Sequence, residues 1–318
     1  MAKITVDDLL NIEGNQVPTD AKSYSTFVYG YPKTGKALDN NTVIPTPIGD
    51  KKVSDVKVGD YLFDREGNPT KVKGVYPQGI LKAYEVTLAD GTSFIVNNEH
   101  IIPYITSRGN ISSKTLEEMM EDYVEYVDSG FNDGRLKKNH KYKIPKSSAV
   151  HYEEKVLPLN PYALGVLIGD GALTCECLTI SSNEEDVIKK FMDKTGLREY
   201  NKSKWNYSYT FQKKHNGNTP KEIQKNIERL GLNVKSIDRF IPKEYLEGSI
   251  KQRKDLLAGL FDTDGHVNIK KTGSKTFVFS TNSKKLSEDV KKLCLSLGYG
   301  VTVRKYDRKD DTHYNTEY

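Results

Sequence analysis

The sequence predicts a multidomain chain in which an all-β region precedes an α/β region made of two tandem repeats. In residues 37–104, short β-branched runs alternate with Gly-Asp, Glu-Gly-Asn and Asp-Gly turns, and closely spaced hairpin signals of this kind favour an all-β fold. Two nonapeptides that end in Asp-Gly follow, at 163–171 and 257–265. After each of them apolar and polar residues alternate, which indicates strands.

The nonapeptides ALGVLIGDG and LAGLFDTDG predict two helices that pack closely and end beside each other. Gly165 and Gly259 would let the helix backbones approach, and each helix would then present one carboxylate, Asp170 or Asp264. Two carboxylates at one interface can hold divalent metal ions over a scissile phosphate. A single copy could equally be a buried helix with a glycine cap, whereas the pair favours a metal site, for which we expect Mg²⁺.

Strands and helices are expected to alternate around the nonapeptides. Tyr209 and Phe211 alternate with polar residues in one segment, and Val267 and Ile269 do so in another. Helical patterns separate these hairpins at 183–195, 219–231 and 283–297. The predicted order is helix, hairpin, helix, hairpin, helix, occurring twice, with the second copy running off the end of the chain.

The paired nonapeptides resemble those of LAGLIDADG homing endonucleases, and LAGLFDTDG matches that name at seven of nine positions. The resemblance implies an α/β endonuclease with tandem αββαββα repeats, whose twisted sheets lie along the major groove of double-stranded DNA. Polar groups on the open sheet faces would contact base edges, and lysines would neutralise phosphates. We expect DNA contacts from Asn206, Ser208, Thr210, Gln212, His266, Asn268, Lys270, Thr302 and Arg304. For any one of them an ordinary solvated strand face is the alternative, and the net charge of +5 allows nucleic-acid binding without requiring it.

Arg239 departs from the pattern of that family. A Lys usually stands there in a K-x-I-P context before the second nonapeptide, whereas this chain has Arg239 followed by Phe240, Ile241 and Pro242. Arginine can supply positive charge beside a phosphate but does not readily donate a proton, because its pKa stays high. The resemblance therefore implies DNA binding more firmly than DNA cleavage.

Residues 37–104 resemble the N-terminal splicing blocks of inteins, the HINT domain, with one block at 38–60 and a second at 90–100. Endonuclease motifs inserted into such a module are usual in large inteins. Splicing begins when a nucleophile at the first intein position attacks the preceding carbonyl. The resemblance assigns His100 to protonating the departing amide nitrogen, and it assigns Asn97 to a hydrogen bond with the same peptide.

Ala37 occupies the first intein position and has no nucleophilic atom. Two explanations remain open at this stage. Either a Cys or Ser has been replaced by engineering, or the chain is of a rarer type in which the residue after the intein attacks directly. In both cases Ala37 marks the position of the splicing nucleophile.

The segment before Ala37 reads GYPKTGK and fits a Walker A loop that lacks its final Ser or Thr. In a complete loop Gly30, Gly35 and Lys36 would surround the phosphates, so ATP would bind only to the spliced host protein. The segment resembles the start of a phage-type or RecA-like P-loop ATPase. A glycine-rich turn before a helix is the alternative.

Nothing after Tyr299 resembles the closing splicing blocks. The C-terminal splicing half is therefore expected elsewhere, either on the complementary C-terminal fragment of a split intein or on a part lost by truncation. The predicted division is an N-extein at 1–36, an N-terminal splicing domain at 37–104, a linker or accessory DNA-contacting region at 105–155 with a helix near 114–127, and the endonuclease at 156–318.

Composition sets only broad bounds. The 318 residues contain 48 basic and 43 acidic side chains. Because neither a membrane-spanning apolar run nor a signal-peptide pattern is present, we expect no membrane contact and a place in the cytoplasm of a bacterial or phage-infected cell. Three cysteines do not make a disulfide framework, and Cys175 and Cys177 are expected on one face of a strand.

Three functions follow from these patterns. The leading hypothesis is the N-terminal part of an intein precursor, which combines self-catalysed protein splicing, disabled by Ala37, with site-specific double-strand cleavage of the intein-free host gene. The first alternative is a freestanding homing endonuclease with a DNA-binding β-domain. The second is a P-loop nucleotide-binding ATPase, although too little of that fold is present for hydrolysis.

Overall fold

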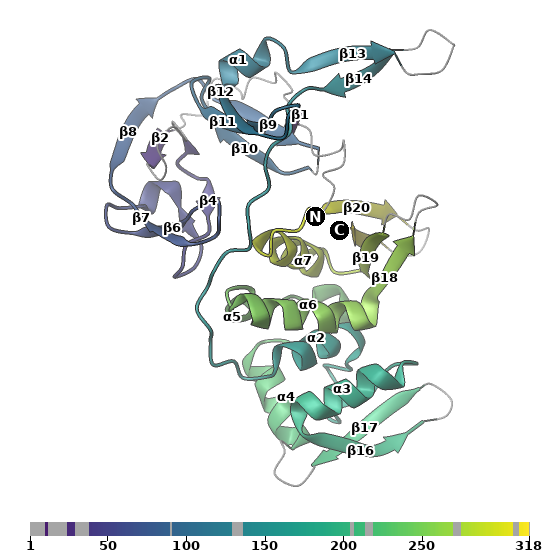
Figure 1. Ribbon diagram of the computed structural model, residues 1–318. Coiled ribbons are helices and arrows are strands. Elements are labelled where there is room, and N and C mark those ends of the chain that lie inside the picture. The colour runs from purple at the N-terminus through teal and green to yellow at the C-terminus, as the bar shows by residue number, and fades with distance from the viewer. Residues whose placement is uncertain are drawn as a thin grey trace. The chain divides into compact units, whose positions relative to one another are not determined.

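The computed structural model describes residues 10–11, 24–28, 38–89, 91–128, 136–203, 207–213, 219–269, 275–307 and 312–317 (Figure 1). The chain divides into two compact units, Met1–His151 and Tyr152–Tyr318. Several residues to which the sequence assigns a role lie outside the described residues, namely Gly30, Gly35, Lys36, Ala37, Asn206 and Lys270.

The first unit is built from short antiparallel strands, as its turn-rich sequence predicts. Its largest sheet has the order β1-β9-β10-β3-β2-β8. The strands of this sheet are β1 (Leu10–Asn11), β2 (Tyr24–Val28), β3 (Leu38–Asp39), β8 (Val75–Ile80), β9 (Tyr84–Leu88) and β10 (Ser93–Val96). Two-stranded sheets join β4 (Val43–Ile44) to β5 (Lys51–Lys52), β6 (Tyr61–Phe63) to β7 (Pro69–Lys71), β11 (Ile101–Ile105) to β12 (Ile111–Thr115), and β13 (Val124–Asp128) to β14 (Leu136–His140).

Residues beyond 104, where the splicing domain was predicted to end, take part in the core of this unit. Leu116 and Tyr142 are buried in one apolar cluster with Val86 and Val96. The compact unit therefore extends to His151. The segment 105–151 includes packed structure, which differs from the predicted linker, and its contact with DNA stays a prediction.

The helix expected near 114–127 is shorter than predicted. Helix α1 (Leu116–Met120) is capped by Thr115, whose side chain accepts a hydrogen bond from the Glu118 amide in a capping box. Strand β13 then follows, because β-branched residues such as Val124 and Val127 favour a strand that pairs with β14.

The second unit contains two repeats of helices and antiparallel strands. The first repeat comprises α2 (Pro161–Asp170), β15 (Thr179–Ser181), α3 (Glu185–Thr195), β16 (Leu197–Lys202), β17 (Ser208–Lys213) and α4 (Pro220–Arg229). After η2 (Ser236–Asp238) and α5 (Lys243–Leu246), the second repeat comprises α6 (Ile250–Asp264), β18 (Gly265–Ile269), β19 (Lys275–Thr281), α7 (Lys284–Ser296), β20 (Thr302–Asp307) and β21 (Thr312–Glu317). Helices α3, α4 and α7 confirm the three helical segments that the sequence predicts.

The first repeat departs from the predicted αββαββα order, because α2 is not followed by a full strand. Gly171 forms only an isolated bridge with Ile180, and the chain then turns through Cys175 and Cys177, which are exposed in the turn rather than placed on a strand. Leu173 and Leu178 are buried at either end of this turn. These two buried leucines anchor the turn, and the residues between them do not alternate between buried and exposed as those of a surface strand would. Among the described residues the sheet orders are β15-β17-β16 and β18-β19-β21-β20.

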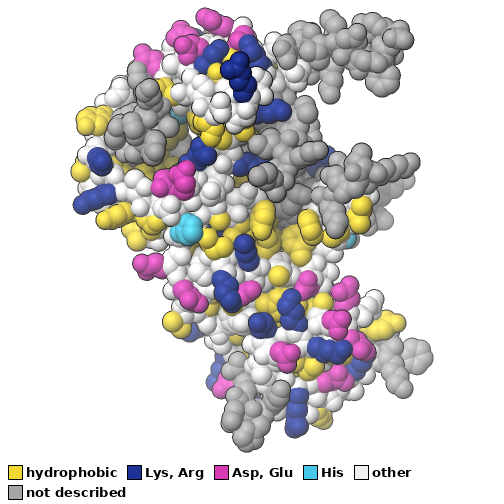
Figure 2. Space-filling view, in the orientation of Figure 1, with side chains coloured by type: hydrophobic (Ala, Val, Ile, Leu, Met, Phe, Trp, Pro, Cys, Tyr) yellow, Lys and Arg dark blue, Asp and Glu magenta, His cyan; other side chains and the backbone are white. Residues whose placement is uncertain are grey.

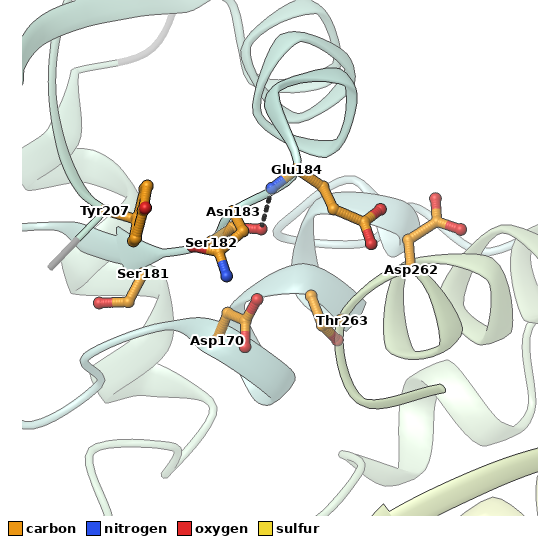
Figure 3. Close-up of a pocket in the computed structure, with 8 residues that line it drawn as sticks. All are labelled: Asp170, Ser181, Ser182, Asn183, Glu184, Tyr207, Asp262 and Thr263. Carbon is orange, nitrogen blue, oxygen red and sulfur yellow. Dashed lines mark hydrogen bonds between the residues drawn. The ribbon is translucent and has the colours of Figure 1, made fainter. Parts of the chain in front are cut away.

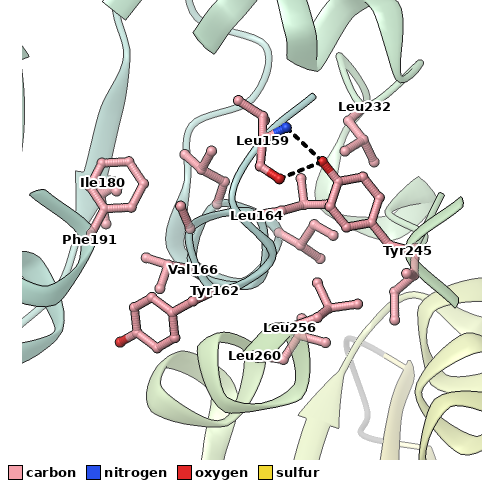
Figure 4. Close-up of a cluster of buried hydrophobic side chains, with 14 of the residues drawn as sticks. Leu159, Tyr162, Leu164, Val166, Ile180, Phe191, Leu232, Tyr245, Leu256 and Leu260 are labelled. Atoms are coloured by element: carbon pink, nitrogen blue, oxygen red, sulfur yellow. Dashed lines mark hydrogen bonds between the residues drawn. The ribbon is translucent and has the colours of Figure 1, made fainter. Parts of the chain in front are cut away.

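The core of the second unit surrounds α2, whose residues from Pro161 to Gly169 are all buried (Figure 4). Leu164 of α2 and Leu256 and Leu260 of α6 belong to one apolar cluster. The hydroxyl of Tyr245 accepts a hydrogen bond from the Leu159 amide and donates one to its carbonyl, at 2.9 Å each. These bonds tie the segment before α2 to α5.

Charged side chains of both signs are mixed over the visible face of the second unit (Figure 2). Within the described parts of the chain, no helix is long and apolar enough to cross a membrane. The surface thus shows the near balance of charges that the composition indicates.

Candidate functional site

Helices α2 and α6 cross with their backbones in contact, as the two nonapeptides predict. A Cβ atom on Gly165 would lie 2.9 Å from the Cα of Gly259 and 2.8 Å from the amide nitrogen of Leu260. A Cβ atom on Gly259 would lie 3.0 Å from the amide nitrogen of Val166. Glycine permits this close approach because it has no Cβ.

Asp170 and Asp264 are the last residues of these two helices. Burial and the negative charge of Asp264 raise the pKa of Asp170 to about 6, and the guanidinium of Arg239 opposes this shift. Burial also raises the pKa of Asp264, again against the effect of Arg239. The two carboxylates therefore share a poorly hydrated region in which a cation would stabilise their charged forms.

Each aspartate lines a pocket of its own, and the first pocket has a volume of about 290 Å³ (Figure 3). Asp170 lies there beside the end of β15, and α6 contributes Asp262 and Thr263 from across the helix interface. The segment between β15 and α3 provides Ser182 and Asn183. Polar groups thus surround the Asp170 carboxylate.

The Asp264 pocket, of about 240 Å³, is built in the same way. Helix α2 contributes Ile168 and Gly169, which occupy the nonapeptide positions that Asp262 and Thr263 occupy in α6. The segment between β19 and α7 provides Thr281 and Asn282. The two repeats therefore form two corresponding half-sites, one for each aspartate.

Asn183 and Asn282 were missed by the sequence analysis. A signal for them exists, because Ser-Ser-Asn at 181–183 and Ser-Thr-Asn at 280–282 both stand directly before a helix of their repeat. Alignment of the two repeats on their nonapeptides, with a gap of five residues, would have brought these triplets together.

The half-sites differ in charge. Asp262 of the Asp170 pocket accepts a hydrogen bond of 2.7 Å from the Tyr162 hydroxyl and forms an ion pair of 3.1 Å with Lys190. The Lys190 ammonium also lies 3.9 Å from the centre of the Tyr162 ring. In the Asp264 pocket the corresponding position is the apolar Ile168, and a guanidinium, that of Arg239, is present instead.

Arg239 contacts the end of α2. Its Nη1 atom donates to the carbonyls of Ile168, at 2.5 Å, and Gly169, and its Nη2 atom donates to the carbonyl of Gly171 at 2.7 Å. Burial lowers the pKa of Arg239, and Asp264 and Asp170 oppose that shift. The positive charge expected beside a phosphate is therefore directed at backbone carbonyls in this structure.

The open face of the first sheet carries the polar residues that the alternation predicts. Ser208, Thr210 and Gln212 of β17 lie on one face, where Thr210 pairs with Thr179 and Gln212 with Arg198. Tyr209 and Phe211 are buried on the other face against the helices. Ser181, which lines the Asp170 pocket, pairs with Ser208, so this pocket borders the polar face.

The second sheet repeats this arrangement. His266 and Asn268 are exposed on one face of β18, and the pairing places Thr302 and Arg304 of β20 on the same face. Val278 interrupts this otherwise polar set. Ser280 lies on the same face of β19 and lines the Asp264 pocket. DNA contact by these residues stays a prediction.

The far end of the hairpin β18–β19 is more exposed than the sequence predicts. Val267 and Ile269 lie on the face of β18 opposite to that of His266, but their side chains are 46% and 68% exposed. Helix α6 ends at Asp264, and within it Phe261 reaches Phe277 and Phe279. The hairpin therefore extends beyond the helices that would cover its apolar face.

In the first unit, Asn97 and His100 lie in the turn between β10 and β11. The His100 amide donates to the carbonyl of Asn97 at 3.2 Å, and the His100 ring lies against Phe94 with 6.4 Å between the ring centres. Asn97 is 6% exposed, and its side-chain oxygen has no hydrogen-bond partner among the described residues. A buried acceptor without a hydrogen-bond partner costs free energy. The side-chain oxygen of Asn97 can therefore accept a hydrogen bond from another group.

Comparison with known proteins gives a family match for the second repeat. Residues 251–317 match the family of the LAGLIDADG-like domain. The matched residues run from α6 to β21 of the second repeat and include the nonapeptide that carries Asp264. The first repeat has the same two elements at its site, a motif helix that ends in aspartate and a polar triplet before the next helix.

Curated relatives include the replicative DNA helicase DnaB of Mycobacterium intracellulare, 27% identical over 288 residues, which are 86% of this chain and 44% of that protein. The RecA protein of Mycobacterium bovis is 36% identical over 72 residues, which are 22% of this chain and 9% of that protein. The chain thus spans less than half the length of the curated relatives it matches.

Two solved structures are similar to parts of this chain. The homing endonuclease I-DmoI in complex with DNA and Mn is 15% identical, with a TM-score of 0.35, over 51% of this chain and 89% of that one. The gp41-1 intein is 29% identical, with a TM-score of 0.24, over 35% of this chain and 79% of that one.

A divalent metal fits the donor groups of the helix interface. Asp170 and Asp264 are hard oxygen ligands, and burial raises the pKa of both, so that a bound cation would stabilise their charged forms. In the described ranges no three His, Cys, Asp or Glu side chains converge on one point. A metal ion would therefore complete its coordination with water and with substrate phosphates, as Mg²⁺ usually does.

Proposed function

We propose that the second unit is a homing endonuclease that cuts both strands of duplex DNA at a specific site. The observation that carries this proposal is the crossing of α2 and α6, which brings Asp170 and Asp264 together at the border of two polar sheet faces. A LAGLIDADG-like match over 251–317 supports it.

Different residues would bind the DNA and take part in its cleavage. Asp170 and Asp264 would hold Mg²⁺, which supplies an activated water and offsets the charge of the transition state. The polar triplets with Asn183 and Asn282 would orient water in each half-site. Ser208, Thr210, Gln212, His266, Asn268, Thr302 and Arg304, together with Asn206 and Lys270, would contact the DNA.

The proposed substrate is the host gene without its insertion, in which the codons for the Walker A loop are uninterrupted. We expect Asp264→Asn to reduce cleavage of a plasmid with that gene by at least about 100-fold in Mg²⁺, because a ligand of the metal is lost. DNA affinity should stay within about tenfold, since the binding faces are separate from the carboxylates.

Asp255→Asn is a matched control, because Asp255 lies on the same helix but pairs with the exposed Lys251. It should cleave like the wild type. Unchanged cleavage by the Asp264 variant would rule out the proposed metal site.

A second function is favoured by the turn at Asn97. We propose that the first unit is the N-terminal part of an intein splicing domain, in which Asn97 and His100 act on the peptide before Ala37. The buried side-chain oxygen of Asn97 supports this proposal, because a scissile peptide N–H would satisfy it. Splicing would need a C-terminal fragment and a nucleophile in place of Ala37.

The host is proposed to be a phage-type or RecA-like P-loop ATPase of a bacterial or phage-infected cell. The partial matches to a replicative DNA helicase and to a RecA protein support this proposal for the host. ATP binding by the isolated chain would favour the nucleotide-binding alternative. DNA cleavage combined with failure of any Ala37 variant to splice with its fragment would favour a freestanding endonuclease.

A further inference from the structure

The ends of the two motif helices are held in different ways. Helix α6 runs directly into β18, where Gly265 pairs with Phe279 of β19 at the start of a regular ladder. Helix α2 is followed only by the isolated bridge between Gly171 and Ile180 and then by a turn. The last carbonyls of a helix have no partner within it, so the end of α2 needs another source of hydrogen bonds.

Arg239 provides that source. Its two Nη atoms donate to the carbonyls of Ile168, Gly169 and Gly171, which flank Asp170 on both sides. A cation at the C-terminal end of a helix is also favoured by the helix dipole. The planar guanidinium can direct several N–H groups at once, which an ammonium on a flexible chain cannot match.

The backbone of Arg239 is itself fixed by helix α7. The Ser283 hydroxyl donates to the Arg239 carbonyl at 2.6 Å, and the Ile241 amide donates to the Asp289 carboxylate at 3.0 Å. Ser283 and Asp289 are both fully or almost fully buried. Arg239 therefore joins the second repeat, through α7, to the end of the first motif helix.

We infer that Arg239 is a positioning residue, which holds the end of α2 and thereby Asp170 in the place where the first repeat lacks a strand. The inference rests on the proposed function for its catalytic consequence only. Through its hydrogen bonds to backbone carbonyls, Arg239 fixes the backbone on both sides of Asp170 and so positions the Asp170 half-site. The Asp264 half-site has its own support in the β18–β19 ladder.

Hydrogen exchange of the full chain tests this arrangement. The Gly171 amide donates to Leu167 and the Gly265 amide donates to Phe261, so these two amides report the ends of α2 and α6. In Arg239→Met we expect exchange at the end of α2 to rise at least about tenfold, with no change at the end of α6. Arg239→Lys should show an intermediate rise, because charge is kept while most of the hydrogen bonds are lost.

Arg253→Lys is the matched control. Arg253 is another buried arginine of this unit, and it donates to the carbonyls of Gly248 and Ser296. Its replacement should lower the thermal midpoint without selective exchange at the end of α2. The inference is overturned if Arg239→Met leaves the end of α2 as protected as in the wild type. It is also overturned if Arg239→Lys equals the wild type, since charge alone would then suffice.

Cleavage gives a second measurement. Under single-turnover conditions with Mg²⁺, Arg239→Met should cut at least about tenfold more slowly, with a Kd for the host-gene DNA within about threefold of the wild type. A phosphate-binding role would instead raise the Kd and lower its salt dependence. If the wild type cuts no DNA, the proposed nuclease fails while hydrogen exchange still decides the role of Arg239.

Discussion

Gly165 and Gly259 lie against each other where α2 crosses α6, with 2.9 Å between the Cα of Gly259 and the point that a Cβ on Gly165 would occupy. No side chain fits between the two backbones, and the contact sets the separation of the helices that end in Asp170 and Asp264.

Replacement of Gly259 by Ala is therefore expected to destabilise the second unit. The added Cβ would meet backbone atoms of Tyr162 and Val166, which cannot move aside, and overpacking of this kind costs about 1–3 kcal/mol. Urea unfolding, monitored by far-ultraviolet circular dichroism, measures the change in the free energy of unfolding. Lys254→Ala, an exposed change on the same helix, should stay within about 0.5 kcal/mol. Equal stability of the two variants would contradict the close contact.

Because of Asp170, the metal-free chain should be more stable at pH 5 than at pH 7.5. Burial raises the pKa of Asp170 in the folded state to about 6, above the ordinary value of an aspartate, so the folded state binds an extra proton as the pH falls from 7.5 to 5. Asp170→Asn should be more stable than the wild type at pH 7.5 in EDTA, by roughly 1–3 kcal/mol. Denaturant midpoints at both pH values measure this. A variant that keeps the full pH dependence of the wild type would show that Asp170 does not cause it.

Arg304 should bind DNA from the open face of the second sheet. It is exposed on β20, and its neighbour Lys305 points to the opposite face of the same strand. Arg304→Ala should weaken binding to host-gene DNA about five- to tenfold and reduce the salt slope by about one. Lys305→Ala is the control and should change neither. Fluorescence anisotropy between 50 and 200 mM salt, roughly the range over which such contacts are screened, distinguishes the two faces.

Ala37→Cys should make the bond before residue 37 cleavable by an added thiol, once a C-terminal splicing fragment completes the fold. The acyl shift needs a thiol or hydroxyl at this position. Mass spectrometry should then detect the released residues 1–36. Adding His100→Ala should suppress release sharply, and adding Asn97→Ala should reduce it, because the departing amide would lose its proton donor or its acceptor. An intact Cys variant, or no effect of His100, would contradict the splicing roles.

Periodicity predicted much of the second unit. Helices α3, α4 and α7 were expected from their apolar spacing, and the alternation around Tyr209 and Phe211 correctly predicted which face of β17 is buried. Local patterns carry this information, because a helix or strand that buries one face must repeat its apolar residues with the period of that element.

The boundary of the first unit was not visible in local patterns. Tyr142 and Leu116 belong to the same buried apolar cluster as Val86, which is distant from both in sequence. Contacts of this kind depend on how hairpins stack, and a hairpin pattern does not contain that information.

The sequence by itself determined the crossing helices and their terminal aspartates. Two helix backbones can touch only where a residue has no Cβ, and Gly165 and Gly259 meet that need. Only the tertiary structure decided how each half-site is supported. The loss of a strand after α2, the hydrogen bonds of Arg239 to Ile168 and Gly171, and the ion pair of Asp262 join segments that are remote in the chain. Such pairings follow from the folded arrangement of the backbone, and an amino-acid pattern of short range does not specify them.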